Sequence, residues 1–187
     1  MSSQDKNLKI DDNGFISCVK QIKSPNQDTR PLNQVISLIV IHSISLPPNN
    51  FDNSYIEDFF SNKLQINQHN YFKKIKDLKV SSHFLIKRKG ELIQFVSCLN
   101  RAWHAGESSW KNKKSCNDFS IGIELEGSDT IKYEDIQYKV LIKLLKSLHM
   151  KYPVVDVVGH SEIAPGRKTD PGDLFDWNLI NAENFNV

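Results

Sequence analysis

Val35-Ile36-Ser37-Leu38-Ile39-Val40-Ile41 is a short, almost wholly apolar run in which β-branched residues dominate. Such a run is typical of a strand that is buried on both faces of a sheet. The paired prolines of the following segment SLPPNN (45–50) predict that the strand stops here, which places His42 at its end. The sequence therefore predicts a buried sheet with an imidazole at one edge.

Segments on the C-terminal side of this run predict the rest of the fold. A helix is predicted to begin at Ser54, where Glu57 completes a capping box. Apolar alternation and turn residues predict a β-hairpin over 82–96 and strands over 120–126 and 154–158. Helical spacing of apolar residues predicts a helix over 133–151. Helices that alternate with strands, together with one hairpin, predict an α/β fold. We expect a single domain over residues 1–187, with a core over about 35–177 built as a central mixed β-sheet flanked by helices.

Residues 64–80 are polar, lysine-rich and only weakly periodic. A long connection of this kind is either a surface excursion or a mobile flap. Both interpretations stay open at the level of the sequence.

Composition excludes several classes of protein. Lys and Arg total 24 against 22 Asp and Glu, and the basic residues are scattered, so neither a nucleic acid nor an anionic membrane is an expected partner. The polar N-terminus lacks the pattern of a secretory signal, and no apolar run approaches the roughly 20 residues that cross a bilayer. Three widely spaced cysteines argue against a disulfide framework. We expect a soluble, cytoplasmic protein, and a monomer.

Three residues are candidate metal ligands. His42 and His160 each follow a predicted strand, and Asp170 lies in the turn-rich segment GHSEIAPGRKTDPG (159–172). Two neutral imidazoles and one carboxylate suit zinc, whose catalytic sites commonly have three protein ligands and one open position. The alternative is a pair of hydrogen-bonded structural histidines and a turn-forming aspartate.

Two further residue types could take part in catalysis. Glu124 and Glu126 lie on the strand face opposite Ile121, Ile123 and Leu125, so either carboxylate is a candidate general base, or else an ion-pair partner. Lys168 could stabilise an oxyanion beside the metal, or it is an ordinary surface lysine. The segment RAWHAG (101–106) combines an aromatic platform with hydrogen-bond donors, which suits a sugar–peptide ligand.

Five motifs occur in the order found in AmpD-type amidases: VIHSISLPP, SSHFLIKRKGELIQFV, RAWHAG, CNDFSIGIELEGSD and GHSEIAPGRKTDPG. The chain resembles this family from about residue 35 to residue 177. The family consists of zinc N-acetylmuramoyl-L-alanine amidases, which cleave anhydromuramyl peptides in cell-wall recycling and are related in fold to peptidoglycan recognition proteins. The resemblance implies an N-acetylmuramoyl-L-alanine amidase-like fold and a small muropeptide substrate.

The resemblance also implies roles for individual residues. One Zn²⁺ per chain would be held by His42, His160 and Asp170, with Glu124 as the catalytic glutamate and Lys168 as the transition-state lysine. The residues that match motifs bordering the substrate groove are Ser43, Trp103, His104 and Arg167. Ser43 is a departure, because the related motif usually reads His-Asn, and a hydroxyl in place of the amide alters one predicted substrate hydrogen bond.

Three other functions compete with the recycling enzyme. A binding module of the same fold would lack hydrolysis, but the retained His, His and Asp argue against it. An endolysin or autolysin would use the same chemistry on intact cell wall. A serine hydrolase lacks support, since no GxSxG motif is present.

Overall fold

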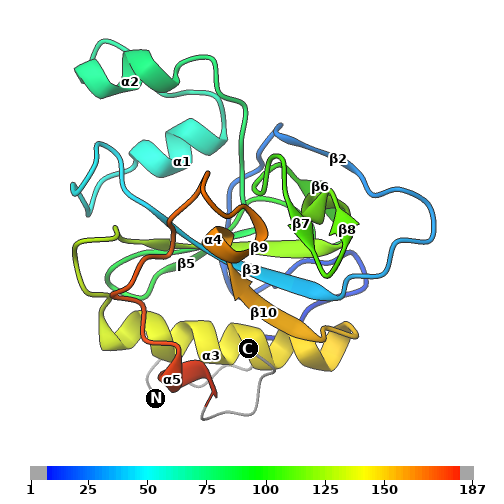
Figure 1. Cartoon of the computed structure of the whole chain (residues 1–187). Coiled ribbons are helices and arrows are strands. Elements are labelled where there is room, and N and C mark those ends of the chain that lie inside the picture. Colours follow the sequence, from blue (N-terminus) through cyan, green and yellow to red (C-terminus); the bar gives the residue numbers. More distant parts are fainter. Residues whose placement is uncertain (1–7, 182–187) are drawn as a thin grey trace.

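A six-stranded mixed sheet forms the centre of the molecule, as seen in a computed structural model that describes residues 8–181 (Figure 1). The strand order is β1-β5-β4-β9-β3-β10, and only the β4–β5 pair is antiparallel. The strands of this sheet are β1 (Lys20–Gln21), β3 (Leu38–Ile44), β4 (Phe84–Ile86), β5 (Leu92–Gln94), β9 (Ser120–Glu126) and β10 (Asp156–Gly159).

Strand β3 is longer at its C-terminal end than the sequence predicts. It pairs in parallel with β9 from Leu38, opposite Ser120, to Ile44, opposite Glu126. His42 therefore lies inside the strand, and the prediction that the strand stops at His42 is wrong. The reason is that the ladder with β9 continues to Ile44, a pairing between distant segments that the local sequence does not record.

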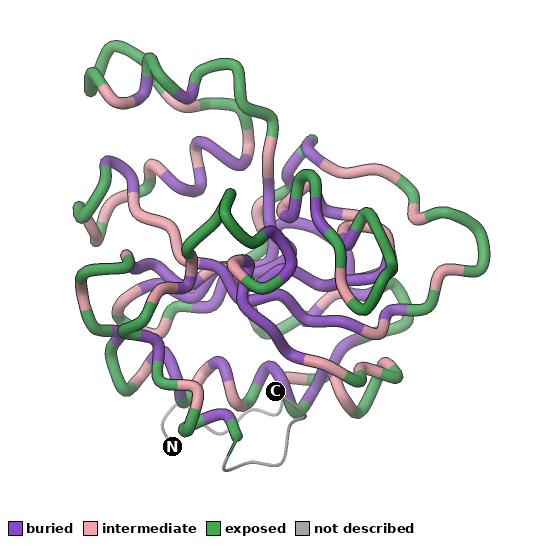
Figure 2. Tube along the Cα trace, viewed as in Figure 1, coloured by how far each residue is buried: buried purple, intermediate pink, exposed green. Residues whose placement is uncertain are grey.

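The long helix α3 (Asp135–Lys151) covers one face of the sheet (Figure 1). Its buried leucines pack against the isoleucine side chains that alternate along β3 and β9, and these residues belong to one large apolar cluster. Figure 2 shows that the central strands are buried along most of their length, whereas buried residues recur at intervals along α3. The predicted helix over 133–151 and the predicted strand over 120–126 are both confirmed.

A second lobe lies on the other side of the sheet and contains α1 (Tyr55–Phe60) and α2 (Asn70–Ile75). Helix α1 begins after Ser54, as predicted, but the predicted capping box is absent. Asn53 Oδ1 accepts from the Tyr55 amide instead, and Glu57 forms a buried ion pair with Lys87 at 3.1 Å. The pairing with Lys87 explains why this glutamate does not turn back to its own helix.

Residues 64–80 contain helix α2, which the weak periodicity did not predict. Only Phe72 and Ile75 of this helix are buried, and the Phe72 ring lies edge-on to Tyr55 at a centroid separation of 4.9 Å. Two buried positions in one short helix give too few apolar repeats to be recognised in a sequence. Whether this segment moves stays a prediction.

Shorter elements complete the fold around one end of the sheet. Strand β2 (Gln27–Thr29) pairs with β6 (Asn100–Ala102), β7 (Ser109–Trp110) pairs with β8 (Lys113–Lys114), and the 3-10 helix η2 (Cys116–Asp118) leads into β9. Two short helices, α4 (His160–Ile163) and α5 (Asn178–Asn181), follow β10. Within residues 8–181, no helix has both the length and the apolar character that a membrane span requires.

The architecture confirms the predicted α/β class. It is a single domain in which helices flank a mixed sheet, and the hairpin over 82–96 is present as β4 and β5. His160 is the first residue of α4 and directly follows Gly159, the last residue of β10. The face of the sheet opposite α3 thus receives polar side chains from β3, β9 and the β10–α4 junction.

Candidate active site

A cavity of about 580 Å³ opens on the face of the sheet opposite α3. Its floor is formed by polar side chains of β3 and β9 and of the segment that follows β10. The other lining residues form two groups: those from residues 46–80 are largely apolar and are called the apolar wall here, and those from residues 127–130 and 167–170 are polar and are called the polar wall. The volume lies within the range of ligand pockets, and the mixed lining suits a ligand with both apolar and polar parts.

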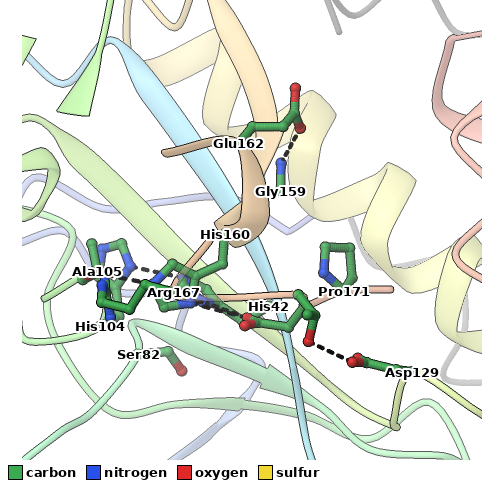
Figure 3. Close-up of polar contacts among 12 residues, drawn as sticks. His42, Ser82, His104, Ala105, Asp129, Gly159, His160, Glu162, Arg167 and Pro171 are labelled. Carbon is green, nitrogen blue, oxygen red and sulfur yellow. Dashed lines mark hydrogen bonds and ion pairs between the residues drawn. The ribbon is translucent and has the colours of Figure 1, made fainter. Parts of the chain in front are cut away.

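Three predicted metal ligands meet on this floor, and Figure 3 shows two of them, His42 and His160. His42 Nδ1 lies 2.9 Å from His160 Nδ1 and 3.2 Å from Asp170 Oδ2, and His160 Nδ1 lies 3.1 Å from the same Asp170 oxygen. Among residues 8–181 this is the group of His, Cys, Asp and Glu side chains whose geometry could hold a metal ion. The residues come from β3, from the start of α4 and from the loop after α4, so the fold brings together positions 128 residues apart in sequence.

The hydrogen bonding of His160 supports the metal interpretation. Its Nε2 lies 3.1 Å from the Ala105 carbonyl oxygen, which can only accept, so the neutral ring is protonated at Nε2 and its Nδ1 lone pair faces the cluster. Tetrahedral zinc bonds of about 2.0–2.2 Å place ligand atoms about 3.3–3.5 Å apart, close to the separations seen here. The three residues therefore fit a small metal ion.

Electrostatics keep His42 and Asp170 in the protonation states that a metal requires. Burial lowers the pKa of His42 to about 4, so this ring is neutral at physiological pH. Burial alone would raise the pKa of Asp170, but hydrogen bonds with His160 and His42 hold it well below its ordinary value. Neutral imidazoles and an ionised carboxylate are the forms that bind metals.

His104 lies directly behind His42. Its Nδ1 is 2.9 Å from His42 Nε2, and its own Nε2 is 3.1 Å from Ser120 Oγ, so the two rings and the hydroxyl form a chain leading away from the cluster. Gly122 makes this possible, because a Cβ there would lie 2.5 Å from the His104 ring. A second hydrogen bond of this kind typically fixes the orientation of a metal-bound imidazole. His104 also lines the cavity, where it was predicted to contact substrate.

Glu124 lies beside His42 on the neighbouring strand, since the two residues are register partners. Its Oε2 is buried, and it has no hydrogen-bond partner among residues 8–181. Burial, reinforced by the charge of Asp170 and opposed by Lys168, raises the pKa of Glu124 well above its ordinary value. A carboxylate with a raised pKa that lines a cavity has the properties of a general base.

Glu126, the alternative base, has a different environment. Its two carboxylate oxygens accept from the Asp52 amide at 3.2 Å and from the Arg88 amide at 3.0 Å. The side chain is fully buried and is absent from the lining of the cavity. The structure therefore favours Glu124 over Glu126 as the reactive carboxylate.

Lys168 and Arg167 occupy the exposed rim of the cavity, on the loop after α4. The Lys168 ammonium is close enough to influence both His42 and Glu124 electrostatically. Arg167 Nη2 donates to the carbonyl of Ala105 at 2.7 Å and also to that of Glu107, which joins its loop to the 105–107 segment (Figure 3). Lys168 thus acts on the cluster electrostatically from the rim, whereas much of the Arg167 guanidinium is already used within the protein.

Trp103 and Ser43 have partners inside the protein. Trp103 lies close enough to Asp28 to help Arg101 lower the pKa of that carboxyl, and it is not among the residues that line the cavity. Ser43 lines the cavity and lies close enough to Tyr133 to lower the pKa of its phenol, against the effect of burial. Contacts of both residues with substrate stay predictions.

Sequence patterns gave no indication of the apolar wall or of the contacts that hold the loops. The wall includes Phe59, Tyr71 and Ile75, which belong to the lobe whose helix α2 was not predicted. On the polar side, Thr169 Oγ1 donates to Asp129 at 2.5 Å. The motif ending in Gly-Ser-Asp (127–129) is the only signal in the sequence that pointed to this second loop.

Comparison with known proteins identifies the family. The N-acetylmuramoyl-L-alanine amidase family profile matches residues 32–173, which include all the residues assigned to the site. The chain belongs to this amidase family. It is therefore a hydrolase that acts on an amide bond, and the resemblance stated from the sequence motifs is confirmed.

Individual relatives agree with this amidase assignment. The 1,6-anhydro-N-acetylmuramyl-L-alanine amidase AmpD of Citrobacter freundii is 47% identical over 173 residues, which cover 91% of this chain and 92% of that protein. A crystal structure of selenomethionine AmpD matches with a TM-score of 0.89 at 46% identity, covering 92% of this chain and 97% of that one. The amidase AmiD of Escherichia coli, solved with the substrate anhydro-N-acetylmuramic acid-L-Ala-D-γ-Glu-L-Lys, matches with a TM-score of 0.60 at 30% identity, covering 84% and 62% respectively.

Proposed function

We propose that this amidase cleaves the amide bond between the lactyl group of 1,6-anhydro-N-acetylmuramic acid and the L-alanine of the stem peptide, in muropeptide recycling. The observation that carries the proposal is the placement of Glu124 beside His42, near the His-His-Asp cluster, with a carboxylate oxygen that has no hydrogen-bond partner among the described residues. The similarity to AmpD and to the substrate-bound AmiD supports the choice of substrate.

One zinc ion per chain would be held by His42, His160 and Asp170. Two imidazole nitrogens and one carboxylate oxygen leave a fourth position open, which is typical of catalytic zinc. When bound, zinc supplies Lewis-acid chemistry that acidifies water and polarises a carbonyl. His104 would hold the His42 ring in orientation through its 2.9 Å contact with Nε2.

The remaining steps are carried out by Glu124 and Lys168. Glu124 takes a proton from the water that attacks the lactyl carbonyl carbon, and the Lys168 ammonium stabilises the negative charge that develops on the carbonyl oxygen. The carbon–nitrogen bond then breaks as Glu124 returns the proton to the departing amine of L-alanine. The products are a free carboxylate on the sugar and a free peptide, and no covalent enzyme intermediate is needed.

The cavity suits this substrate class. Its apolar wall, with Phe59, Phe60 and Tyr71, offers ring and aliphatic surface to a sugar, and its polar wall offers hydrogen-bonding groups to a peptide. The cluster and Glu124 lie on the floor between the two walls, where the bond joining sugar and peptide would be placed.

The decisive experiment is an assay on anhydromuramyl tripeptide with metal analysis. We expect the purified protein to contain zinc, to lose activity with a chelator and to regain it on zinc addition. The reducing-sugar tripeptide, measured in parallel, shows which form of muramic acid is preferred. Full cleavage by a preparation proven free of metal would contradict the mechanism.

Two tests distinguish the proposed function from those of a binding module and of an endolysin or autolysin. Zinc binding without hydrolysis of any muropeptide would indicate a binding module of the same fold. Release of peptide from intact cell wall at a rate similar to that on the small substrate would favour an endolysin or autolysin. The cytoplasmic location is part of the proposal, and cell fractionation that finds the protein in the periplasm or at the wall would overturn it.

A further inference from the structure

Tyr133 connects the two segments that carry His42 and Asp170. Its hydroxyl donates to the Pro171 carbonyl oxygen at 2.8 Å, one residue beyond Asp170. Burial raises the pKa of the same hydroxyl, and Ser43, the neighbour of His42 on β3, is close enough to oppose this rise. Because the phenol proton is given to Pro171, the Ser43 hydroxyl can act on the phenol oxygen only as a donor. Tyr133 therefore lies between β3 and the loop after α4.

The position of the Tyr133 ring is closely defined by its surroundings. The residue is only 7% exposed, and its ring lies edge-on to Phe175 at a centroid separation of 5.4 Å and to Tyr138 at 6.2 Å. Gly127 gives it room, because a Cβ at that position would lie 2.4 Å from the ring. A ring confined in this way places its hydroxyl with little freedom.

The loop that carries Asp170 is held at three successive residues. Thr169 Oγ1 donates to Asp129, the Asp170 carbonyl accepts from the Ser161 amide at 2.9 Å, and the Pro171 carbonyl accepts from Tyr133. The Ser161 contact ties the loop to α4, which begins with His160. The Tyr133 contact ties the loop to the strands, because the Tyr133 ring packs against Gly127, whose amide donates to the Ile44 carbonyl of β3 at 2.9 Å.

We propose that Tyr133 is a positioning residue for the metal site, which fixes the Asp170 loop relative to His42, and that Ser43 is its support on β3. The inference rests on the metal ligation stated under the proposed function. It also gives a role to Ser43, the position where the motif departs from its usual His-Asn form. The residue places two ligand-bearing segments against each other and needs no contact with substrate.

The test compares two hydroxyl deletions within the same aromatic cluster. Tyr133→Phe removes the bond to Pro171, whereas the matched control Tyr138→Phe removes a bond of equal length, 2.8 Å, from the Asp176 amide. Zinc affinity is measured on the full chain by competition with a chromophoric chelator. We expect Tyr133→Phe to bind zinc about 10-fold or more weakly, and Tyr138→Phe to bind it like the wild type, since loss of an outer contact typically costs 10–100-fold.

Two additional measurements keep the test independent of folding and of activity. The absorption spectrum of the cobalt-substituted protein should change in Tyr133→Phe and stay unchanged in Tyr138→Phe, because it reports ligand geometry. Ser43→Ala, which removes the supporting donor, should weaken zinc binding by a smaller factor and serves if Tyr133→Phe does not fold. Equal zinc affinities and equal spectra for the wild type, Tyr133→Phe and Ser43→Ala would overturn the inference.

A failure of the inference about Tyr133 can be distinguished from a failure of the proposed function. If the wild type binds zinc but cleaves no muropeptide, the function is wrong and the affinity comparison still decides the role of Tyr133. If the wild type binds zinc and cleaves substrate while all variants bind zinc equally, only the role of Tyr133 is wrong.

Discussion

The two faces of strands β3 and β9 differ in chemistry although they share the same backbone. Toward α3, residues such as Ile41 and Ile123 are fully buried in the main apolar cluster. Toward the cavity, His42 and Glu124 alternate with them, and the Glu124 Oε2 atom has no hydrogen-bond partner in the described part of the chain. Because side chains alternate along a strand, one pair of strands supports both stability and reactivity without a conflict at any single position.

The largest effect, on turnover, should come from the strand face that carries His42 and Glu124. Glu124→Gln keeps the shape of the side chain but removes its ability to accept a proton, so we expect turnover of anhydromuramyl tripeptide to fall by about 10²–10⁴. The free energy of unfolding should be unchanged or higher, because burial disfavours the charged form of Glu124. Steady-state kinetics and denaturant unfolding of the same preparation measure both. A variant that retained wild-type turnover would remove Glu124 from its role.

On the face that packs against α3, a substitution should lower stability and leave turnover unchanged. Ile123→Ala leaves a cavity beneath α3, and we expect it to lower the free energy of unfolding by about 2–5 kcal/mol. Turnover per folded molecule, measured well below the unfolding transition, should stay close to that of the wild type. If turnover fell as far as in Glu124→Gln while the protein remained folded, the separation between the faces would not hold.

A smaller effect, on zinc affinity, is expected for His104, which contacts His42 but is not itself one of the three metal ligands. His104→Ala removes the 2.9 Å contact to His42 Nε2 and should weaken zinc binding by about 10–100-fold. His149→Ala, on the outer helix α3, is the matched control and should leave zinc affinity unchanged. Chelator competition measures both variants, and equal affinities would show that His42 needs no support from His104.

The smallest effect concerns pH and Glu126. Burial raises the pKa of Glu126 in the folded state. Below the ordinary glutamate pKa of about 4.3, Glu126 therefore contributes to the free energy of unfolding, and this contribution is lost as the pH rises from that value through the raised pKa. Glu126→Gln cannot titrate, so its unfolding free energy should fall less steeply over the same interval. Urea unfolding of both proteins from pH 4 to pH 7 gives the two slopes. A steeper fall in the variant would contradict the assigned sign.

Sequence patterns were sufficient where local alternation and global fold agree. Strand β9 has the predicted bounds, Ser120–Glu126, because its isoleucines repeat every second residue above a polar row. Helix α3 was equally clear from its leucine spacing. The end of β3 was misplaced since it depends on pairing with β9, a contact between segments that are about 80 residues apart in the chain.

The site was only partly predictable, for a related reason. His42, His160, Asp170 and Glu124 could be named from strand positions and motifs, but the motifs could not tell Glu124 from Glu126. That distinction depends on which carboxylate meets backbone amides, and those of Asp52 and Arg88 reach only Glu126. The contacts of His104 with His42 and of Tyr133 with Pro171 join distant segments through single atoms, and no periodicity records them.

The register between β3 and β9 also limits how this chain can change length. His42 faces Glu124 only because every pair from Leu38 and Ser120 onward is aligned. One inserted residue within either strand would turn the following side chains to the other face, exchanging the imidazole or the carboxylate for an isoleucine or a leucine. The loops between the strands carry no such constraint. Insertions and deletions should therefore accumulate in those loops and be absent from residues 38–42 and 120–124, however far the rest of the sequence diverges.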